Sequence, residues 1–483
     1  MELTRKISGI IDSKSRQFID TSDRIWEFSE TRFEESQSAD LIASVLTHEG
    51  FTVDRGVAGL DTALIGSFGT GSPVIAILGE YDALAGLSQK AGSTEYEPLV
   101  SKGNGHGCGH NLLGGGALAA AVAVKEYMLE NGLAGTIRYY GCPAEESGYG
   151  KTYMARNGLF RDVDAAFSWH PYTGNAIWHA SSNAVIHATF QFIGRSSHAA
   201  ASPHLGRSAL DAVELMNVGV NYMREHMIDE ARIHYAITNT GGFSPNVVQP
   251  EAEVTYLIRA PKTSQVRELF ARVQDIARGA ALMTQTKMEY RIEGGCANLI
   301  PNATLGRVMY KYMTELGVPA ATEEEIRFAK AIYESISKED KKTAAAQVGK
   351  KLAVKLAERP IPDFIVPFTE ELSFMAASTD VADVSWNAPT AQCFTATWAF
   401  GTPFHTWQAV AQGQSSYAHK AMLYAGKIMA CAAVEALQDP DLLAKAKSEL
   451  LEQLDGETYD CLVPSDVRPP RLSQLKQGQF ETV

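Results

Sequence analysis

The chain has 483 residues, of which 45% are hydrophobic and 20% charged, a composition typical of soluble globular proteins. This length exceeds what one compact core takes, so we expect two or three globular units. The formal net charge of −13, with no polybasic cluster to reverse it, argues against a nucleic-acid or anionic-membrane surface and favours small molecules and proteins as partners.

The first third of the chain alternates between helical and strand patterns. Residues 5–49 predict helices, and strands are predicted at residues 51–53, 63–68 and 74–78. A helical run rich in Ala and Val follows at residues 112–129, and apolar strands follow at residues 135–141 and 163–170. This alternation predicts an α/β domain built on a central mixed sheet.

A second unit is predicted in the middle of the chain, where the patterns follow the order β-α-β-β-α-β. That order describes a ferredoxin-like α+β unit inserted between two halves of the first domain. We therefore divide the chain into residues 1–183, 184–296 and 297–483, of which the outer two form one domain. Strands of the insert are expected at residues 184–193, 234–240, 246–258 and 287–292, and its helices at residues 205–227 and 264–283.

A further insertion is expected at residues 322–360, where acidic runs lie among helix formers. Its charge predicts a solvated helical excursion rather than a binding site.

A thiol and an imidazole stand two residues apart in the glycine-rich segment Cys108-Gly109-His110, just before the predicted helix at 112–129. The positive end of that helix favours an anionic ligand such as a thiolate, so the pair is a candidate for metal binding. The alternative is a small buried Cys beside a structural loop His, and the pair alone does not decide between the two.

Two adjacent carboxylates, Glu145 and Glu146, follow the strand at 135–141. In an open α/β sheet the carboxyl end of a strand faces the ligand crevice. Two carboxylates that face one site repel each other unless cations neutralise them, which predicts one metal ligand and one general base. The alternative is a solvated acidic turn.

Two more histidines occupy comparable places. His170 ends the strand at 163–170 and is followed by Pro171, and His405 follows a Gly-Thr-Pro turn. Each alone is compatible with a structural role. Together, the candidate donors suffice for two first-row metal ions, and they are Cys108, His110, Glu146, His170 and His405.

The order of these motifs resembles that of the co-catalytic metallo-amidohydrolases, a family that includes aminoacylase, carboxypeptidase G and auxin-conjugate hydrolases. The resemblance extends from the first helix to near the C-terminus. It rests on the segments at residues 28–35, 79–84, 108–110 and 143–146, together with His170 and His405.

The resemblance implies a catalytic domain with two divalent ions per subunit, Mn or Zn, and an inserted lid and dimerisation domain. It places the general base at Glu145 and metal ligation at Cys108, His110, Glu146, His170 and His405. Asp82 then orients a ligand, and Cys108 takes a position that a bridging Asp holds in many relatives.

Three residues of the insert receive roles from the same resemblance. His198 reaches the active site of the partner subunit and stabilises the developing oxyanion, whereas Asn246 and Arg259 hold the substrate carboxylate. The alternatives are a capping or dimer-contact role for His198 and a solvent-facing salt bridge for Arg259. The protein is then a homodimer or a heterodimer with a related subunit.

Two assignments near the C-terminus stay open. Asp380 and Asp383 are both candidates for the acidic residue that supports the metal centre. Trp407, two residues after His405, is compatible with lining an aromatic pocket for an aryl amide and equally with a structural role.

The resemblance implies metal-dependent hydrolysis of the amide bond of an N-acyl or N-aroyl amino acid, with p-aminobenzoyl-glutamate as the expected substrate. The alternatives are a hydrolase of other N-acyl amino acids or dipeptides, or a subunit that is active only with a related partner chain. A non-catalytic subunit and a cysteine hydrolase using Cys108 are two further alternatives. A degenerate subunit is expected to lose ligands or the base, yet all are present here. The glycine loop suits co-ligation by Cys108 and His110 better than a nucleophile-base pair.

The cysteines and the N-terminus bear on location. Six cysteines lie scattered without a disulfide framework, which is typical of a reducing compartment. The chain begins with an amphipathic helical pattern rather than a signal-peptide core, and no run of 18 or more apolar residues occurs. We therefore expect a cytoplasmic protein.

Overall fold

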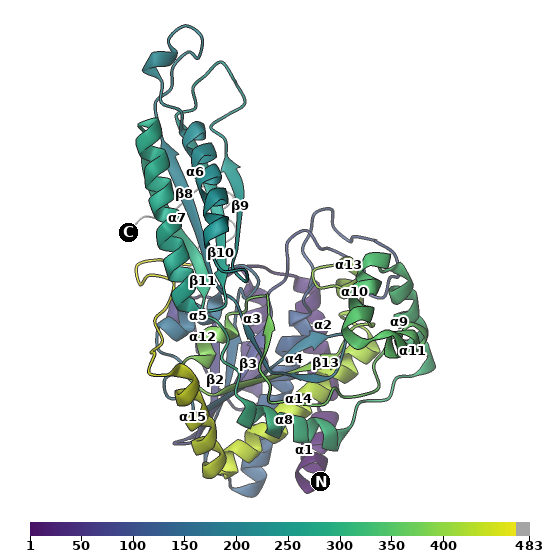
Figure 1. Ribbon diagram of the computed structural model, residues 1–483. Helices are drawn as coiled ribbons and strands as arrows, with labels where there is room; N and C mark the ends of the chain where they lie inside the picture. The colour runs from purple at the N-terminus through teal and green to yellow at the C-terminus, as the bar shows by residue number, and fades with distance from the viewer. Residues whose placement is uncertain (470–483) are drawn as a thin grey trace.

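The computed structural model describes residues 1–469. Figure 1 shows a broad α/β unit that carries the N-terminus, with a narrow second unit projecting from it. The projecting unit comprises the elements from β8 to β11, and the chain enters and leaves it at the same end.

The broad unit is built on a seven-stranded mixed sheet with the strand order β1-β2-β4-β3-β5-β13-β6. The four central strands run parallel, whereas β1, β2 and β6 are antiparallel to their neighbours. β3 is buried along its whole length, as expected of a parallel strand covered on both faces. The strands are β1 (Thr52–Arg55), β2 (Leu64–Thr70), β3 (Val74–Glu80), β4 (Gly135–Cys142), β5 (Ala165–Tyr172), β6 (Ala176–Trp178) and β13 (Thr390–Ala396).

Helices cover both faces of this sheet. The larger layer packs on one face around α4 and α14 and contributes most of the hydrophobic core. Its helices are α1 (Glu2–Ser13), α2 (Ser15–Phe28), α3 (Ser36–His48), α4 (His110–Asn131), α8 (Ala303–Leu316), α14 (Ser416–Gln438) and α15 (Pro440–Leu454). The other face is covered by α5 (Gly150–Arg156) and α12 (Val381–Ser385), which pack on each other around a separate cluster.

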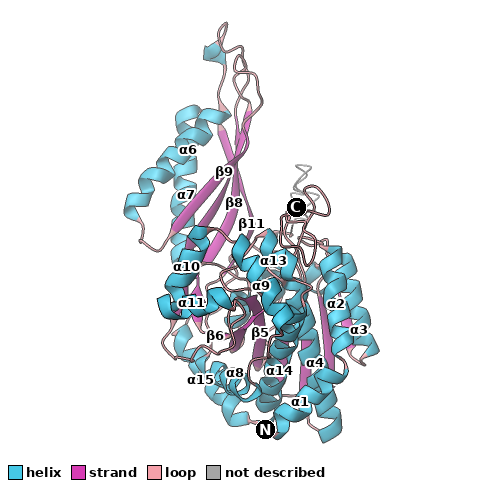
Figure 2. Cartoon of the chain, turned by 90° about the vertical axis from the view of Figure 1, so that its right-hand side faces the viewer, coloured by secondary structure: helices cyan, strands magenta, loops and turns pink. Residues whose placement is uncertain are grey.

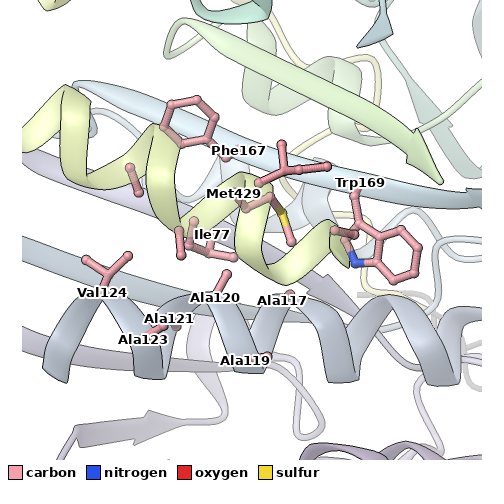
Figure 3. Packing of buried hydrophobic residues seen from close by; sticks show 14 of the residues in the cluster. Ile77, Ala117, Ala119, Ala120, Ala121, Ala123, Val124, Phe167, Trp169 and Met429 are labelled. Atoms are coloured by element: carbon pink, nitrogen blue, oxygen red, sulfur yellow. The ribbon is translucent and has the colours of Figure 1, made fainter. Parts of the chain in front are cut away.

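The helix α4 lies in the middle of the core. Figure 3 shows its Ala117 and Ala120 facing Met429 of α14 and the side chains of the sheet. Small side chains let these elements approach closely, and a Cβ at Gly114 would lie 2.6 Å from the carbonyl oxygen of Glu80. By length and composition α4 could cross a membrane, with a mean hydropathy of 1.4, but 89% of that window is buried inside the protein, as in a core helix.

The projecting unit is a four-stranded antiparallel sheet with the order β11-β8-β10-β9, and both of its long helices pack on one face. Figure 2 shows the helices beside the strands. This is the ferredoxin-like arrangement, so the predicted fold class is confirmed. The elements are β8 (Ala184–Ile193), α6 (Ala209–Met223), β9 (Arg232–Asn239), β10 (Glu251–Ala260), α7 (Thr263–Thr284) and β11 (Lys287–Cys296).

Two boundaries in this unit differ from the prediction. The strand predicted to begin at residue 246 begins at Glu251, because Asn246 lies in a turn closed by a bond from the Val247 N–H to the Ser244 carbonyl. The helix predicted from residue 205 begins at Ala209, where Ser208 caps it by accepting from the Asp211 N–H.

The insertion after α8 is helical, as predicted, but not uniformly solvated. α10 (Lys338–Val348) buries no residue, whereas α9 (Glu323–Ser335) packs Ile326, Ala329 and Ile332 inward. Trp407 is partly buried and packs against the cluster that includes Ala329 and Ile332, which favours its structural alternative. The remaining elements are η1 (Val57–Gly59), β7 (Ala180–Ser182), η2 (Pro203–Leu205), η3 (Arg224–His226), α11 (Lys350–Glu358), β12 (Ser373–Met375) and α13 (Trp407–Gln412).

Candidate metal centre

The candidate ligands gather at the carboxyl edge of the central parallel strands. Glu80 ends β3, Glu145 and Glu146 follow β4, and His170 lies near the end of β5. The connection after β3 passes through α4 on one face, and the connection after β4 passes through α5 on the other. Ligands bind at such a reversal of winding in open α/β sheets.

Asp82 holds two parts of this site together. Its Oδ1 atom accepts from His110 Nδ1 at 2.8 Å, and its Oδ2 atom accepts from the backbone N–H of Glu146 at 3.0 Å. His110 therefore carries a proton on Nδ1, so Nε2 is the atom that would bind a metal. Asp82 thus links His110 to the segment that carries Glu146.

His170 resembles His110 in that its Nδ1 atom donates a hydrogen bond and its Nε2 atom faces the candidate donors. Its Nδ1 donates to the carbonyl of Pro171 at 2.8 Å, and its Nε2 lies 3.5 Å from the sulfur of Cys108. Burial, followed by the charge of His110, lowers the pKa of His170 to about 4. A neutral imidazole with a fixed Nδ1–H is the form that ligates metals.

Two backbone constraints bring Cys108 and His405 together. Gly109 has a φ of +75°, and a Cβ there would lie 3.0 Å from the Pro171 side chain. His405 adopts a φ of 59°, and its N–H donates to the carbonyl of Gly107 at 3.0 Å. The loop 105–109 therefore depends on glycine for both its turn and its close contacts.

The donor atoms form overlapping groups whose members all lie within 4.8 Å of one another. One group is Cys108, His110 and His170, and a second is Cys108, Glu146 and His405. The sulfur of Cys108 thus belongs to both. A third group joins Glu80, His110 and Glu145.

The chemistry of the site fits divalent cations. His110 Nε2, Glu80 Oε2 and Glu146 Oε1 are buried and make no hydrogen bond within the described residues, although the first two lie 3.2 Å apart. Leaving buried polar atoms without partners is costly, and a cation would satisfy all of them. Thiolate, imidazole and carboxylate in these numbers are donors that first-row metals accept.

Glu145 lies among other carboxylates. Burial, followed by the charges of Glu80 and Asp380, raises the pKa of Glu145 well above its usual range. The neighbourhood therefore carries an excess of negative charge, which bound cations would offset.

Sequence reasoning missed a buried ion network beneath these residues. Lys151, at the start of α5, places its Nζ 2.7 Å from Glu80 Oε1 and 2.6 Å from Asp380 Oδ1. The other oxygen of Glu80 lies 3.2 Å from His110 Nε2. Of the two aspartates left open by the sequence, Asp380 connects to the centre in this way.

Asp383 has different partners. It accepts from Thr152 and Tyr459 side chains at 2.8 and 2.7 Å and from the Ala297 N–H at 3.2 Å. These bonds join α12 to α5 and to the segments that follow β11 and α15 rather than to the candidate ligands.

The three candidate residues of the projecting unit do not lie together. His198 pairs with Val247, and the Ala199 N–H donates to the carbonyl of Asn246, so His198 and Asn246 are neighbours. Arg259 instead donates to Ser378 Oγ at 3.2 Å, next to the broad unit. Arg259 and Glu251 stand at opposite ends of β10, roughly 25 Å apart for a strand of this length.

His198 is exposed, and its Nδ1 atom accepts from the N–H groups of Ala200 and Ala201 at 3.2 and 3.0 Å. The neutral ring therefore carries its proton on Nε2. His198 is thus a hydrogen-bond donor at the tip of the projecting unit without needing a positive charge.

Comparison with known proteins identifies the family. The family model described as peptidase family M20/M25/M40 matches residues 76–385. The chain belongs to this family. It is 48% identical over 478 residues to a p-aminobenzoyl-glutamate hydrolase subunit of Escherichia coli K12, covering 98% of this chain and 99% of that protein.

More distant relatives include a further hydrolase subunit and a solved structure of the same family. The chain is 28% identical to a second, different p-aminobenzoyl-glutamate hydrolase subunit of Escherichia coli K12, over 50% of this chain and 57% of that protein. A solved structure of a dinuclear metal-binding M20 peptidase from Bacillus subtilis superimposes with a TM-score of 0.55 at 17% identity, covering 88% of this chain and 99% of that chain.

These findings confirm the family, the fold class and the enzyme class that the sequence predicted. The chain is a hydrolase of a metal-dependent peptidase and amidohydrolase family.

Proposed function

We propose that this protein hydrolyses the amide bond of N-aroyl and N-acyl amino acids, with p-aminobenzoyl-glutamate as its preferred substrate. The observation that carries the proposal is the 48% identity along nearly the whole chain to a hydrolase named for that substrate, together with a complete set of clustered metal donors. A subunit that had lost catalysis would not need to keep this set.

Two divalent ions are proposed to bind per subunit. Cys108, His110 and His170 would hold one, and Cys108, Glu146 and His405 the other, so that the thiolate of Cys108 is shared. Bound there, the ions would lower the pKa of a water molecule and polarise the scissile carbonyl group. Thiolate and imidazole suit zinc, whereas the carboxylate content suits manganese.

Glu145 is proposed as the general base. It lies within 4.8 Å of donor atoms of His110 and Glu80, next to the ligand Glu146 but outside the two ligand groups that share Cys108. Its carboxylate would accept the proton of the attacking water and deliver it to the departing amine, which needs one group that is close to the site and not itself a ligand.

The geometry of the projecting unit supports an active site shared between two subunits. Arg259 lies beside the broad unit of its own chain, where a planar guanidinium fits a substrate carboxylate. His198 and Asn246 lie beyond the opposite end of β10 from Arg259, which supports a role for both in the site of a neighbouring molecule. We propose that the partner subunit's His198 stabilises the oxyanion and that Asn246 of the partner subunit binds the substrate together with Arg259.

A surface suited to such a partner lies on the same unit. β9 is the edge strand of its sheet and exposes Tyr235 and Ile237, and α6 exposes Val218 and Tyr222. Apolar side chains on an edge strand favour association. We propose either a homodimer or, because two of the relatives are named as different subunits of one hydrolase, a heterodimer with a related chain.

The proposed division into domains rests on the two structural units of the chain. We propose residues 1–183 and 297–483 as the catalytic domain and residues 184–296 as the lid and dimerisation domain, although residues 470–483 lie outside the described part of the chain. All six cysteines are free thiols, which supports our proposal of a cytoplasmic location.

Turnover of a panel of substrates tests the proposal. The purified protein is dialysed against chelator, reloaded with Mn²⁺ or Zn²⁺, and given p-aminobenzoyl-glutamate, N-acetyl-glutamate and simple dipeptides. We expect metal-dependent release of glutamate, fastest from p-aminobenzoyl-glutamate. Absence of hydrolysis by the metal-loaded protein, both alone and mixed with a related subunit, would contradict the proposal.

A further inference from the structure

Aromatic side chains surround one side of the candidate ligand His170. Phe394 of β13 lies 6.3 Å from the His170 ring between centroids, and Trp178 stacks on Phe394 at 4.8 Å with an interplanar angle of 17°. Tyr172 lies 4.6 Å from Phe394, and Phe404 lies 5.6 Å from both Tyr172 and His170. We call Tyr172, Trp178, Phe394 and Phe404 the aromatic wall.

Strand register explains why these rings share a face. His170 pairs with Phe394 in the parallel ladder of β5 and β13, so their side chains point to the same side of the sheet. Tyr172 is two residues further along β5 and keeps that side. Trp178 of β6 pairs with Gln392, two residues before Phe394, and therefore also faces that side.

The aromatic wall is not a sealed core. Phe404 is 40% exposed, and Tyr172 and Phe394 are partly exposed. Trp178 is buried, and its indole N–H has no hydrogen-bond partner within residues 1–469. Exposed aromatic faces beside a buried donor without a partner are features of a surface that binds a ligand rather than of a packed interior.

We propose that the aromatic wall binds the aryl ring of the substrate's acyl half and so makes the enzyme prefer aroyl over alkanoyl amino acids. This inference rests on the proposed function and names the residues that would give it its specificity. Aryl rings stack offset or edge-on against such faces, and the wall contacts His170, so the bound ring would lie next to the scissile amide.

A purely structural role for the same rings has a different signature. If the wall only held His170 in place, its loss would slow every substrate equally and lower metal content. If it binds the aryl ring, its loss would lower kcat/KM for p-aminobenzoyl-glutamate more than for N-acetyl-glutamate, which has no ring.

The test uses Phe394→Leu and Phe404→Leu in the full chain loaded with Mn²⁺. Because Phe404 is already exposed, its variant is expected to fold even if Phe394→Leu does not. We expect the ratio of kcat/KM for p-aminobenzoyl-glutamate over N-acetyl-glutamate to fall about tenfold in each variant, from the lost stacking. An unchanged ratio would overturn the proposal.

The matched control is Phe328→Leu. Phe328 also packs on an aromatic ring, Tyr417 at 6.3 Å, but it lies on α9 outside the wall. Its substitution is expected to leave the ratio unchanged, and a fall equal to that of the wall variants would count against the wall.

Binding of p-aminobenzoate to the holoenzyme, measured by calorimetry, separates this inference from the proposed function. We expect the wild-type protein and Phe328→Leu to bind it and the two wall variants to bind it about tenfold more weakly. A wild-type protein that hydrolyses p-aminobenzoyl-glutamate but does not bind p-aminobenzoate would overturn the proposed role of the aromatic wall and leave the proposed function intact. Binding that depends on the wall, without any hydrolysis, would support the wall and contradict the proposed function.

Discussion

Lys151 and Asp380 form an ion pair of 2.6 Å in the protein interior, where neither side chain is exposed to solvent. The same ammonium group lies 2.7 Å from Glu80, whose second oxygen faces His110. The pair thus fixes α5 against α12 and, through Glu80, supports the floor of the candidate metal centre. Buried charges of this kind are tolerable only while each keeps its partner.

We predict that Lys151→Met destabilises the protein by about 3–5 kcal/mol, because two buried carboxylates would lose their counter-charge. Urea unfolding of the chelated protein measures this loss without a contribution from metal binding.

The matched control is Lys125→Met. Lys125 is also nearly buried, but its partners Glu49 and Glu126 both pair with Lys14 as well. Their charges stay compensated, so we expect a smaller loss. Equal losses of unfolding free energy in the two variants would show that the ion network around Lys151 does not stabilise the protein more than the network around Lys125 does.

Metal content tests the shared position of Cys108. Because its sulfur belongs to both donor groups, we predict that Cys108→Ala weakens both sites, whereas His405→Ala weakens one and retains about one ion per subunit. Mass spectrometry after dialysis at fixed free Mn²⁺ gives the count. Cys142→Ala, a buried thiol bonded to the Tyr140 carbonyl, is the control and should retain both ions. Loss of a single ion in both Cys108→Ala and His405→Ala would argue against sharing.

Local patterns are sufficient to predict most of the strand ends and the donors placed there. His170 lies near the end of an apolar strand, Glu146 follows one, and Cys108 stands before a long helix. Their convergence is expected because parallel strands present their carboxyl ends to one crevice. The order of elements likewise predicts the ferredoxin-like unit, whose sheet has the expected four strands.

What the sequence could not predict depends on contacts between distant segments. Lys151 has the pattern of a solvated surface charge, and its partner Asp380 lies 229 residues away. The aromatic wall joins β5, β6 and β13, whose adjacency in the sheet does not follow chain order. Val247 and Val248 favour a strand from Asn246 onward, yet Pro250 separates them from β10.

Mixing of inactive variants tests the sharing of active sites in a homodimer. His198→Ala and Glu145→Gln should each be inactive alone. In a mixed dimer, the subunit with the His198 substitution keeps its own Glu145 and receives His198 of the partner subunit. After subunit exchange we predict recovery of roughly a quarter of wild-type activity, since half of the dimers are mixed and each has one complete site.

The amount of each variant is held constant in that assay, and each is also mixed with itself. Recovery of activity only in the mixture of the two different variants supports the proposal that His198 acts in the active site of the other subunit. No recovery, despite dimers that demonstrably exchange, would place His198 in a role within its own chain.

The most direct test of the account is the release of glutamate from p-aminobenzoyl-glutamate by metal-loaded wild-type protein and by Glu145→Gln, with metal content measured on the same samples. Glu97→Gln, an exposed carboxylate paired with Lys90, serves as the control and should match the wild type. We predict that Glu145→Gln binds the same amount of metal and loses at least about a hundredfold in kcat, because only the proton transfer is removed. A fully metallated Glu145→Gln protein that hydrolyses the substrate at the wild-type rate would contradict the account.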